Sequence, residues 1–220
     1  MKESKLHVYL MPGMAANPSI FERISLPKDR YELHLLSWIL PLKNESLRDY
    51  ALRMCEKIVH PNAVLVGVSF GGVLVQEMSK HLDLKKLIII SSVKSKHELP
   101  KRMKIAKRTK AYKILPTSLI KNFDALAKYA FGETVVKRVE LYKKYLSVRD
   151  KAYLDWAIHN MVNWDQDAPI EGIVHIHGEK DAVFPAGHLD GYIEVKGGTH
   201  VMVINKFKWF NENLPKIIEA

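Results

Sequence analysis

The chain contains a single cysteine, Cys55, among its 220 residues. One thiol cannot form an intramolecular disulfide, so the composition is compatible with a reducing compartment. No apolar run approaches the roughly 18 residues that would span a bilayer. The apolar stretch from Met1 to Pro12 ends without a small-residue cleavage site. We therefore expect a cytoplasmic protein with no secretory signal and no stable membrane insertion.

Several common motifs for cofactors are also missing. The sequence has no Gly-x-Gly-x-x-Gly fingerprint and no Walker lysine after a glycine-rich turn, so we expect no nucleotide cofactor. No His/Cys/Asp group has the spacing of metal ligands, so we expect no metal and no cofactor at all. Two histidines, His175 and His177, fall on an expected strand and are interpreted as packing residues. Five others carry no further signal: His7, His34, His60, His81 and His97.

Charge is unevenly distributed along the chain. The formal net charge is +10, yet the stretch from Lys101 to Lys151 holds fifteen Lys or Arg against four acids, a local charge of +11. A basic segment can bind nucleic acid or anionic lipid, but lysine-rich helix faces are usually only solvated. We expect no nucleic-acid partner. The composition does not determine whether this charge steers anionic substrates, nor which oligomeric state the chain adopts.

Short β-branched runs bounded by turn residues predict about six strands. Most are apolar throughout, as in a parallel sheet covered on both faces. Segments with helical spacing alternate with them, which indicates one α/β domain with a doubly wound, mostly parallel sheet. The expected strands are 6–10, 31–38, 63–68, 86–90, 173–176 and 192–195, and the expected helices are 47–59, 73–82 and 203–218, the last broken before Pro215.

The alternation lapses between residues 93 and 164, where helix-like segments follow one another with no clear strand. We therefore expect a core made of residues 1–92 and 165–220, interrupted by a helical insertion at 93–164. The chain leaves the sheet after the fourth strand and returns before the fifth. The insertion should therefore start and finish near the carboxyl ends of the strands.

The segment from Gly67 to Gly72 joins an expected strand directly to a helix through Gly-x-Ser-x-Gly-Gly. Such a turn is tight enough to strain the backbone of Ser69, and the glycines remove β-carbons that would collide. The Ser69 hydroxyl is left exposed at the end of the strand, where it can act as a nucleophile. A glycine-rich turn of nucleotide-binding type is the alternative, although its fingerprint is absent.

A serine nucleophile needs a base and a group that orients this base. Asp181 follows the fifth expected strand, and His200 follows the sixth, so both should lie at the same sheet edge as Ser69. Asp181 could be only a turn former. Asp165 and Asp167 compete for the role of the acid, but both precede the fifth strand, so Asp181 is favoured.

These three stretches, Gly67–Gly72, His177–Pro185 and Gly197–His200, resemble the signature segments of the α/β-hydrolase superfamily. The chain order Ser, Asp, His is the order of that superfamily. The resemblance covers nearly the whole chain and implies an α/β-hydrolase fold, trimmed of leading antiparallel strands, with 93–164 as a cap. It further implies an oxyanion hole formed by the backbone N–H groups of Met14 and Phe70. Pro12-Gly13 departs from the His-Gly that family members often have there.

The resemblance implies an enzyme that hydrolyses a small-molecule carboxylic ester or thioester through an acyl-serine intermediate. Acyltransferases, amidases and carbon-carbon hydrolases use the same triad, so the fold does not choose among them. A non-catalytic ligand-binding protein on the same fold is the alternative from another class.

Overall fold

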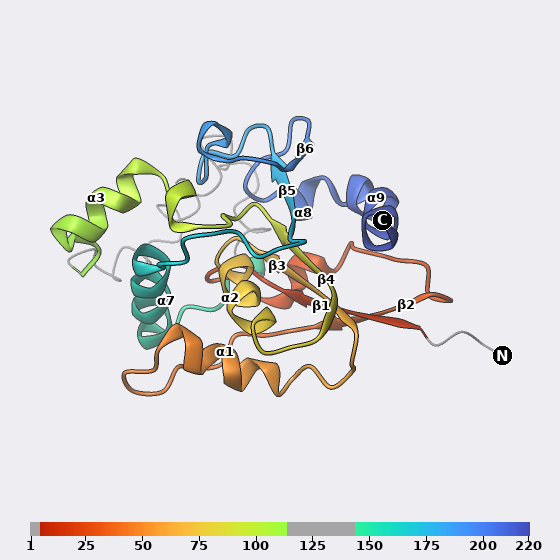
Figure 1. Ribbon diagram of the computed structural model, residues 1–220, viewed down its shortest axis with the longest axis horizontal. Helices are drawn as coiled ribbons and strands as arrows, with labels where there is room; N and C mark the ends of the chain where they lie inside the picture. Colours follow the sequence, from red (N-terminus) through yellow and green to blue (C-terminus); the bar gives the residue numbers. More distant parts are fainter. Residues whose placement is uncertain (1–4, 114–143) are drawn as a thin grey trace.

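The computed structural model describes residues 5–113 and 144–220. Strands and helices alternate along most of this part of the chain (Figure 1). The strands are β1 (Leu6–Met11), β2 (Tyr31–Leu35), β3 (Ala63–Val68), β4 (Leu84–Ile90), β5 (Val174–Gly178) and β6 (Ile193–Val195). The α-helices are α1 (Leu47–Cys55), α2 (Phe70–Ser79), α3 (Lys101–Thr109), α7 (Lys151–Asn163), α8 (Met202–Asn205) and α9 (Phe207–Glu219).

The six strands form one sheet in the order β2-β1-β3-β4-β5-β6, and all five pairings are parallel. Every strand therefore ends at the same edge of the sheet, where the loops that follow the strands meet. The predicted parallel α/β sheet is confirmed. No antiparallel strand precedes it among the described residues, as the resemblance implied.

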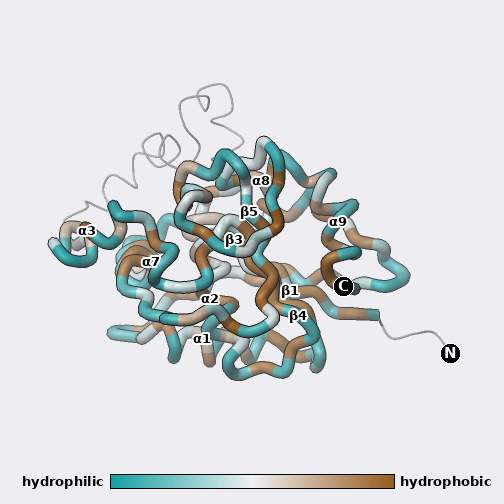
Figure 2. Tube along the Cα trace, turned by 45° about the horizontal axis from the view of Figure 1, so that its top comes forward, coloured by the Kyte–Doolittle hydropathy of each residue, from teal (hydrophilic) through white to brown (hydrophobic). Residues whose placement is uncertain are grey.

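Hydrophobic cores lie on both faces of the sheet. One face packs against α8, α9 and the short 3-10 helix Pro18–Phe21, and the other packs against α1, α2 and α7 (Figure 1). The central strand β3 is buried along its whole length. Figure 2 shows hydrophobic residues following the strands, with hydrophilic residues concentrated on the outer turns. Burial on both faces explains why the strands read as continuous apolar runs.

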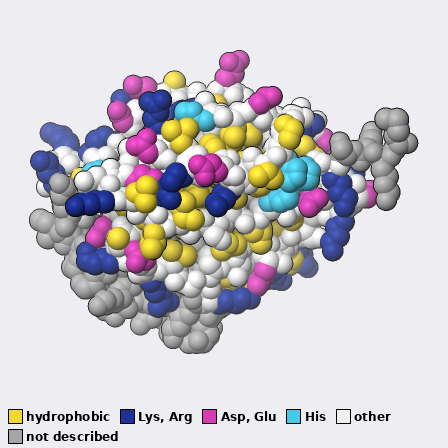
Figure 3. All heavy atoms as spheres, turned by 90° about the horizontal axis from the view of Figure 1, so that it is seen from below, with side chains coloured by type: hydrophobic (Ala, Val, Ile, Leu, Met, Phe, Trp, Pro, Cys, Tyr) yellow, Lys and Arg dark blue, Asp and Glu magenta, His cyan; other side chains and the backbone are white. Residues whose placement is uncertain are grey.

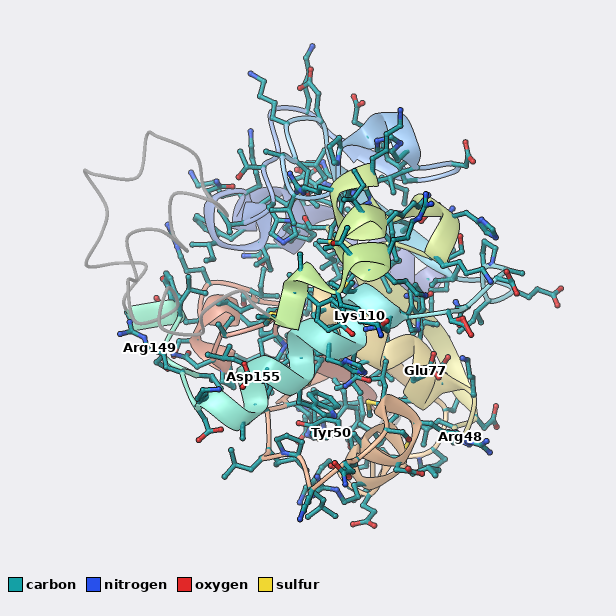
Figure 4. The ribbon with its side chains drawn as sticks, turned by 90° about the vertical axis from the view of Figure 1, so that its left-hand side faces the viewer. Arg48, Tyr50, Glu77, Lys110, Arg149 and Asp155 are labelled. Atoms are coloured by element: carbon teal, nitrogen blue, oxygen red, sulfur yellow. The ribbon has the colours of Figure 1, made fainter. Side chains whose placement is uncertain are left out.

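Helix α7 packs against the helices that cover the sheet. The rings of Tyr50 and Trp156 lie 4.3 Å apart, and the indole of Trp164, just after α7, donates to the Glu77 carboxylate at 2.9 Å. Figure 4 shows Tyr50 between α1 and α7, with Glu77 on the neighbouring α2. Much of the predicted insertion, residues 114–143, lies outside the described part of the chain, so the boundaries 93 and 164 stay a prediction.

The end of the chain differs from the expectation. The break in the helical segment lies at Lys206, between α8 and α9, and α9 continues through Pro215. A proline inside a helix removes a hydrogen bond and crowds the preceding turn. Here Pro215 is buried, and its neighbours Leu214 and Ile218 pack in the core. The apolar contacts of α9 therefore outweigh the local cost of the proline.

No helix in residues 5–113 and 144–220 is long and apolar enough to cross a bilayer.

Glycine is required at positions 67 and 71, where β3 and α2 pack closely together. A Cβ on Gly67 would lie 2.4 Å from the carbonyl oxygen of Gly71 and 2.5 Å from a methyl group of Val75. A Cβ on Gly71 would lie 2.3 Å from the carbonyl oxygen of Pro12. Neither backbone oxygen can move without disturbing the helix or the loop after β1. The glycines of the Gly-x-Ser-x-Gly motif therefore allow strand, helix and loop to approach one another.

Gly67→Ala should lower the free energy of unfolding by about 3 kcal/mol, because the added methyl group overlaps the backbone of α2. The matched control is Gly187→Ala, where a Cβ would have no neighbour within 4 Å. That control should change stability by less than about 1 kcal/mol. Urea denaturation of both variants measures the difference. Equal stabilities would contradict the close packing of β3 against α2.

Candidate active site

Ser69 occupies the turn between β3 and α2. Its backbone has φ 53° and ψ −122°, in the left-handed range that L-residues rarely adopt. Two hydrogen bonds hold this conformation: the Ser69 N–H donates to Ile90 O at 2.9 Å, and the Ser92 hydroxyl donates to Ser69 O at 2.7 Å. The expected strain at Ser69 is present. It turns the side chain out of the strand and leaves it partly exposed.

Asp181 and His200 approach Ser69 from the loops that follow β5 and β6. His200 Nε2 lies 3.0 Å from Ser69 Oγ, and His200 Nδ1 lies 2.9 Å from Asp181 Oδ2. The three residues predicted from the sequence thus form a continuous hydrogen-bonded relay. Asp181 is 4% exposed. Ser69 and His200 are partly exposed, so the relay runs from a buried acid toward solvent.

The partners determine which nitrogen of His200 carries the proton. A carboxylate oxygen only accepts hydrogen bonds, so the Nδ1 beside Asp181 must carry a hydrogen. In the neutral ring, Nε2 is then free to accept the hydroxyl proton of Ser69. The arrangement can therefore activate a serine hydroxyl by general-base chemistry.

The molecule resembles solved structures over nearly its whole length. A bromoperoxidase from Bacillus anthracis gives a TM-score of 0.74 at 16% identity, covering 99% of this chain and 93% of that one. A hydrolase from Pseudomonas aeruginosa PA01 gives 0.72 at 14% identity, with 98% and 91% covered. An esterase from Exiguobacterium antarcticum gives 0.69 at 17% identity, with 99% and 93% covered.

The chain has the α/β-hydrolase fold. No protein-family model matches the sequence, and no curated protein matches it at the sequence level. At these identities the likeness shows the fold alone. In this fold Ser69 lies at the turn between β3 and α2. The Gly-x-Ser-x-Gly motif predicted this position.

The Asp181 carboxylate is held at both oxygens. Oδ1 accepts the backbone N–H groups of Val183 and Phe184 at 2.8 and 2.9 Å, while Oδ2 faces His200. Burial raises the pKa of Asp181, but the opposing effects of His200, the Phe184 N–H and His177 leave it below the ordinary value. Asp181 therefore stays ionised at neutral pH, as a group that orients an imidazole must.

His177 is a contact of the acid that sequence reasoning missed. Its Nε2 lies 2.8 Å from Phe184 O and 3.5 Å from Asp181 Oδ2. Because a carbonyl only accepts, Nε2 carries the hydrogen, and His177 Nδ1 accepts from His175 Nε2 at 3.1 Å. The expectation that both are packing histidines is met in part, since both are buried. The alternation of side chains along β5 does not predict this contact, because it forms only where the loop that carries Asp181 folds back over the strand.

The loop after β1 lies directly beside Ser69. A Cβ on Gly13 would be 3.3 Å from the Ser69 Cβ, so this backbone approaches the hydroxyl closely. The Gly13 carbonyl accepts hydrogen bonds from the Trp38 indole at 2.9 Å and from the Ala16 N–H at 3.1 Å. Trp38 also stacks on Phe70 at 5.4 Å. Trp38, which sequence reasoning also missed, thus links the two segments that carry the predicted oxyanion donors.

Phe70 is the first residue of α2, and the first N–H groups of a helix have no partner within the helix. The Phe70 N–H therefore suits a developing anion, and Met14 follows the glycine that contacts Ser69. Their role as oxyanion donors stays a prediction.

The competing acids lie elsewhere. Asp167 pairs with Lys96 Nζ at 2.6 Å and with His97 Nε2 at 3.3 Å, and its side chain is 73% exposed. Asp165 is also exposed. The segment runs closer to the carboxyl edge than its place before β5 suggested, because the Lys96 N–H bonds to Gln166 O. Of the three candidates, Asp181 is the one in contact with His200.

Cys55 does not compete as a nucleophile. Burial raises the pKa of its thiol to about 11, so the reactive thiolate is scarce at neutral pH. No cysteine other than Cys55 occurs in the chain.

Burial lowers the pKa of His175 to about 3, with smaller contributions from His177 and Lys94. In the unfolded chain His175 binds a proton as the pH falls through 6.5, whereas in the folded chain the buried imidazole stays neutral down to about pH 3. The free energy of unfolding should therefore decrease as the pH falls below 6.5. Between pH 7 and pH 4 this loss should be about 3 kcal/mol. Urea denaturation across this range should show a weaker pH dependence for His175→Gln than for wild type. The exposed control His81→Gln should retain the wild-type slope. An unchanged slope in His175→Gln would contradict the neutral buried imidazole.

Proposed function

We propose that this chain is a serine hydrolase that cleaves a carboxylic ester or thioester through an acyl-Ser69 intermediate. The observation that supports it best is the relay itself: Ser69 Oγ, His200 and Asp181 are joined by contacts of 3.0 and 2.9 Å on a strained turn. Strained residues persist where the surrounding structure maintains them, and they cluster at active sites.

In the first half-reaction, His200 Nε2 takes the proton of Ser69 as Oγ attacks the carbonyl carbon of the substrate. The N–H groups of Met14 and Phe70 then stabilise the negative oxygen of the tetrahedral intermediate. Its collapse breaks the bond to the leaving alcohol or thiol, which receives the proton from His200. The acyl group stays on Ser69.

In the second half-reaction, His200 removes a proton from water as the water oxygen attacks the acyl carbon. The second tetrahedral intermediate expels Ser69 Oγ, which recovers the proton from His200, and the carboxylic acid leaves. Asp181 keeps the imidazole in one tautomer and stabilises its charged form throughout. No cofactor is required by these steps.

Hydrolysis is favoured over the alternatives by the likeness to structures described as esterases and hydrolases. An acyltransferase or a carbon-carbon hydrolase would use the same three residues, and a non-catalytic binding protein would need none of them. The intact relay argues against the binding protein, since binding alone does not require a hydroxyl, an imidazole and a carboxylate in hydrogen-bond contact.

We further propose that residues 93–164 form a cap beside Ser69 that selects the substrate. One contact supports this: Arg102, on the exposed and basic helix α3, donates to Val183 O at 2.5 Å and to Ala182 O at 3.1 Å. These carbonyls belong to the two residues that follow Asp181 in the loop after β5. The start of the insertion is thereby linked to the loop that holds the acid.

Ser69→Ala should abolish ester hydrolysis, lowering kcat by about a millionfold, because it removes the hydroxyl oxygen that contacts His200 Nε2. Alanine tolerates the turn as well as serine does, so the melting temperature should change little. An assay with p-nitrophenyl esters of graded acyl length measures the rate, and a fluorophosphonate probe reports covalent labelling. Wild-type rates or equal labelling in Ser69→Ala would refute the proposal.

Asp181→Asn should lower kcat by about ten-thousandfold, because the amide favours the wrong tautomer of His200. Asp165→Asn and Asp167→Asn serve as matched controls, since they remove one carboxylate charge from neighbouring exposed positions. Both controls should keep most of the activity. If Asp165→Asn or Asp167→Asn lost activity while Asp181→Asn stayed active, the residue changed in the inactive control would be the acid.

A further inference from the structure

Three histidines without an individual signal in the sequence meet on one face of the sheet. His7 lies on β1, His34 lies on β2 and His60 lies in the loop between α1 and β3. In the parallel register Tyr9 pairs with His34, and His7 lies two residues before Tyr9, so these side chains share one face. The chain that leaves α1, the helix covering this face, brings His60 to the same place.

Each ring contacts the others. His7 Nδ1 lies 2.9 Å from His34 Nε2, and the His7 and His60 rings stack with centroids 3.4 Å apart. One nitrogen from each of the three rings lies within 4.8 Å of the others. All three side chains are half-buried, and Figure 3 shows histidine side chains gathered on the surface of this side of the molecule. An ion can therefore reach the cluster from solvent.

We propose that His7, His34 and His60 bind a zinc ion. Tetrahedral zinc with nitrogen ligands at 2.0–2.1 Å needs nitrogen atoms about 3.3 Å apart. His7 Nδ1 and His34 Nε2 lie 2.9 Å apart, and one nitrogen of each of the three rings lies within 4.8 Å of the others. The stacked rings of His7 and His60 would have to tilt away from each other for all three lone pairs to point at one ion. Among the described residues this is the one group of three His, Cys, Asp or Glu side chains with suitable spacing.

Residues around the cluster supply what a histidine zinc site needs. The Tyr9 hydroxyl lies 2.6 Å from His60 Nδ1, which orients this ring and leaves Nε2 for the ion. Ligand histidines are commonly fixed in this way through their second nitrogen. The Glu32 carboxylate lies 4.0 Å from His7 Nδ1, and it or a water molecule would take the fourth position.

The chemistry of the donors selects the class of ion. Three imidazoles with one nearby carboxylate suit zinc or a related transition metal, while magnesium and calcium prefer a set of oxygen ligands.

The position of the site indicates a stabilising role. His7 stands four residues before Met11 along β1, about 13 Å from the strand end that leads to the loop beside Ser69. A bound ion would instead connect the edge strand β2, its neighbour β1 and the loop that enters β3. Binding to the folded state alone would raise the melting temperature.

The test uses the full chain freed of metal with a chelator. Isothermal titration with Zn²⁺ should show one ion per chain, and Co²⁺ should give the intense visible absorption of a tetrahedral site. His34→Gln and His60→Gln should each weaken Zn²⁺ binding by more than about a hundredfold, and Tyr9→Phe should weaken it by about tenfold to a hundredfold. His81→Gln removes an exposed histidine outside the cluster and should bind Zn²⁺ like wild type.

His34 lies within a strand, so its substitution could disturb folding, whereas His60→Gln changes a residue in a loop. Circular dichroism checks that each variant is folded. Zinc should raise the melting temperature of wild type and of His81→Gln, but not that of His60→Gln. Absence of one-to-one binding in wild type, or wild-type affinity in folded His34→Gln and His60→Gln, would overturn the proposal. Labelling of Ser69 by a fluorophosphonate should be the same with and without Zn²⁺, so the two proposals are tested separately.

Discussion

The close approach of α2 to the loop after β1 is the constraint on which the rest of the site depends. The helix backbone at Gly71 lies so near the Pro12 carbonyl that no side chain fits between them. Helix α2 must therefore start immediately after β3, and Ser69 takes a left-handed conformation to make the turn. The same contact brings Gly13 against Ser69, so the turn and the loop beside it are fixed together.

The parallel sheet then determines which other residues can reach Ser69. The loops that follow the strands meet at one edge, and β5 and β6 contribute Asp181 and His200 from the neighbouring side of β4. Burial of Asp181 alone would favour its protonated form. His200 at Oδ2, with smaller contributions from the Phe184 N–H at Oδ1 and from His177, reverses this preference and lowers the pKa of Asp181. Residues that hold the loop of Asp181 therefore act on the charge state of the relay.

Much of this arrangement could be predicted from the sequence, because apolar runs indicate the strands. The parallel order of the strands then places their carboxyl ends at one edge. The strand β3 was predicted with its observed bounds, and the α/β sheet follows from the alternation of elements. Local patterns were weaker at element ends. Helix α2 begins at Phe70, three residues before its expected start, because the turn at Ser69 overrides the poor helix propensity of the glycines that follow.

Contacts between distant segments were beyond prediction, since they depend on how loops fold back over the sheet. His177 reaches Asp181 because the loop after β5 reverses onto its own strand. Trp38 was expected at the end of a strand, whereas β2 ends at Leu35 and frees the indole to bond with Gly13. Neither contact leaves a periodic or spaced signal in the sequence.

The three clustered histidines extend this argument to the opposite half of the sheet. Metal motifs are recognised in sequences when the ligands share a helix or a tight turn, which sets their spacing. His7, His34 and His60 are separated by more than twenty residues each, and the β1–β2 register and the exit of α1 bring them together. A site assembled only by strand register exists only in the folded chain. An ion bound there would therefore favour the same β1–β2 pairing on which the loop beside Ser69 is built.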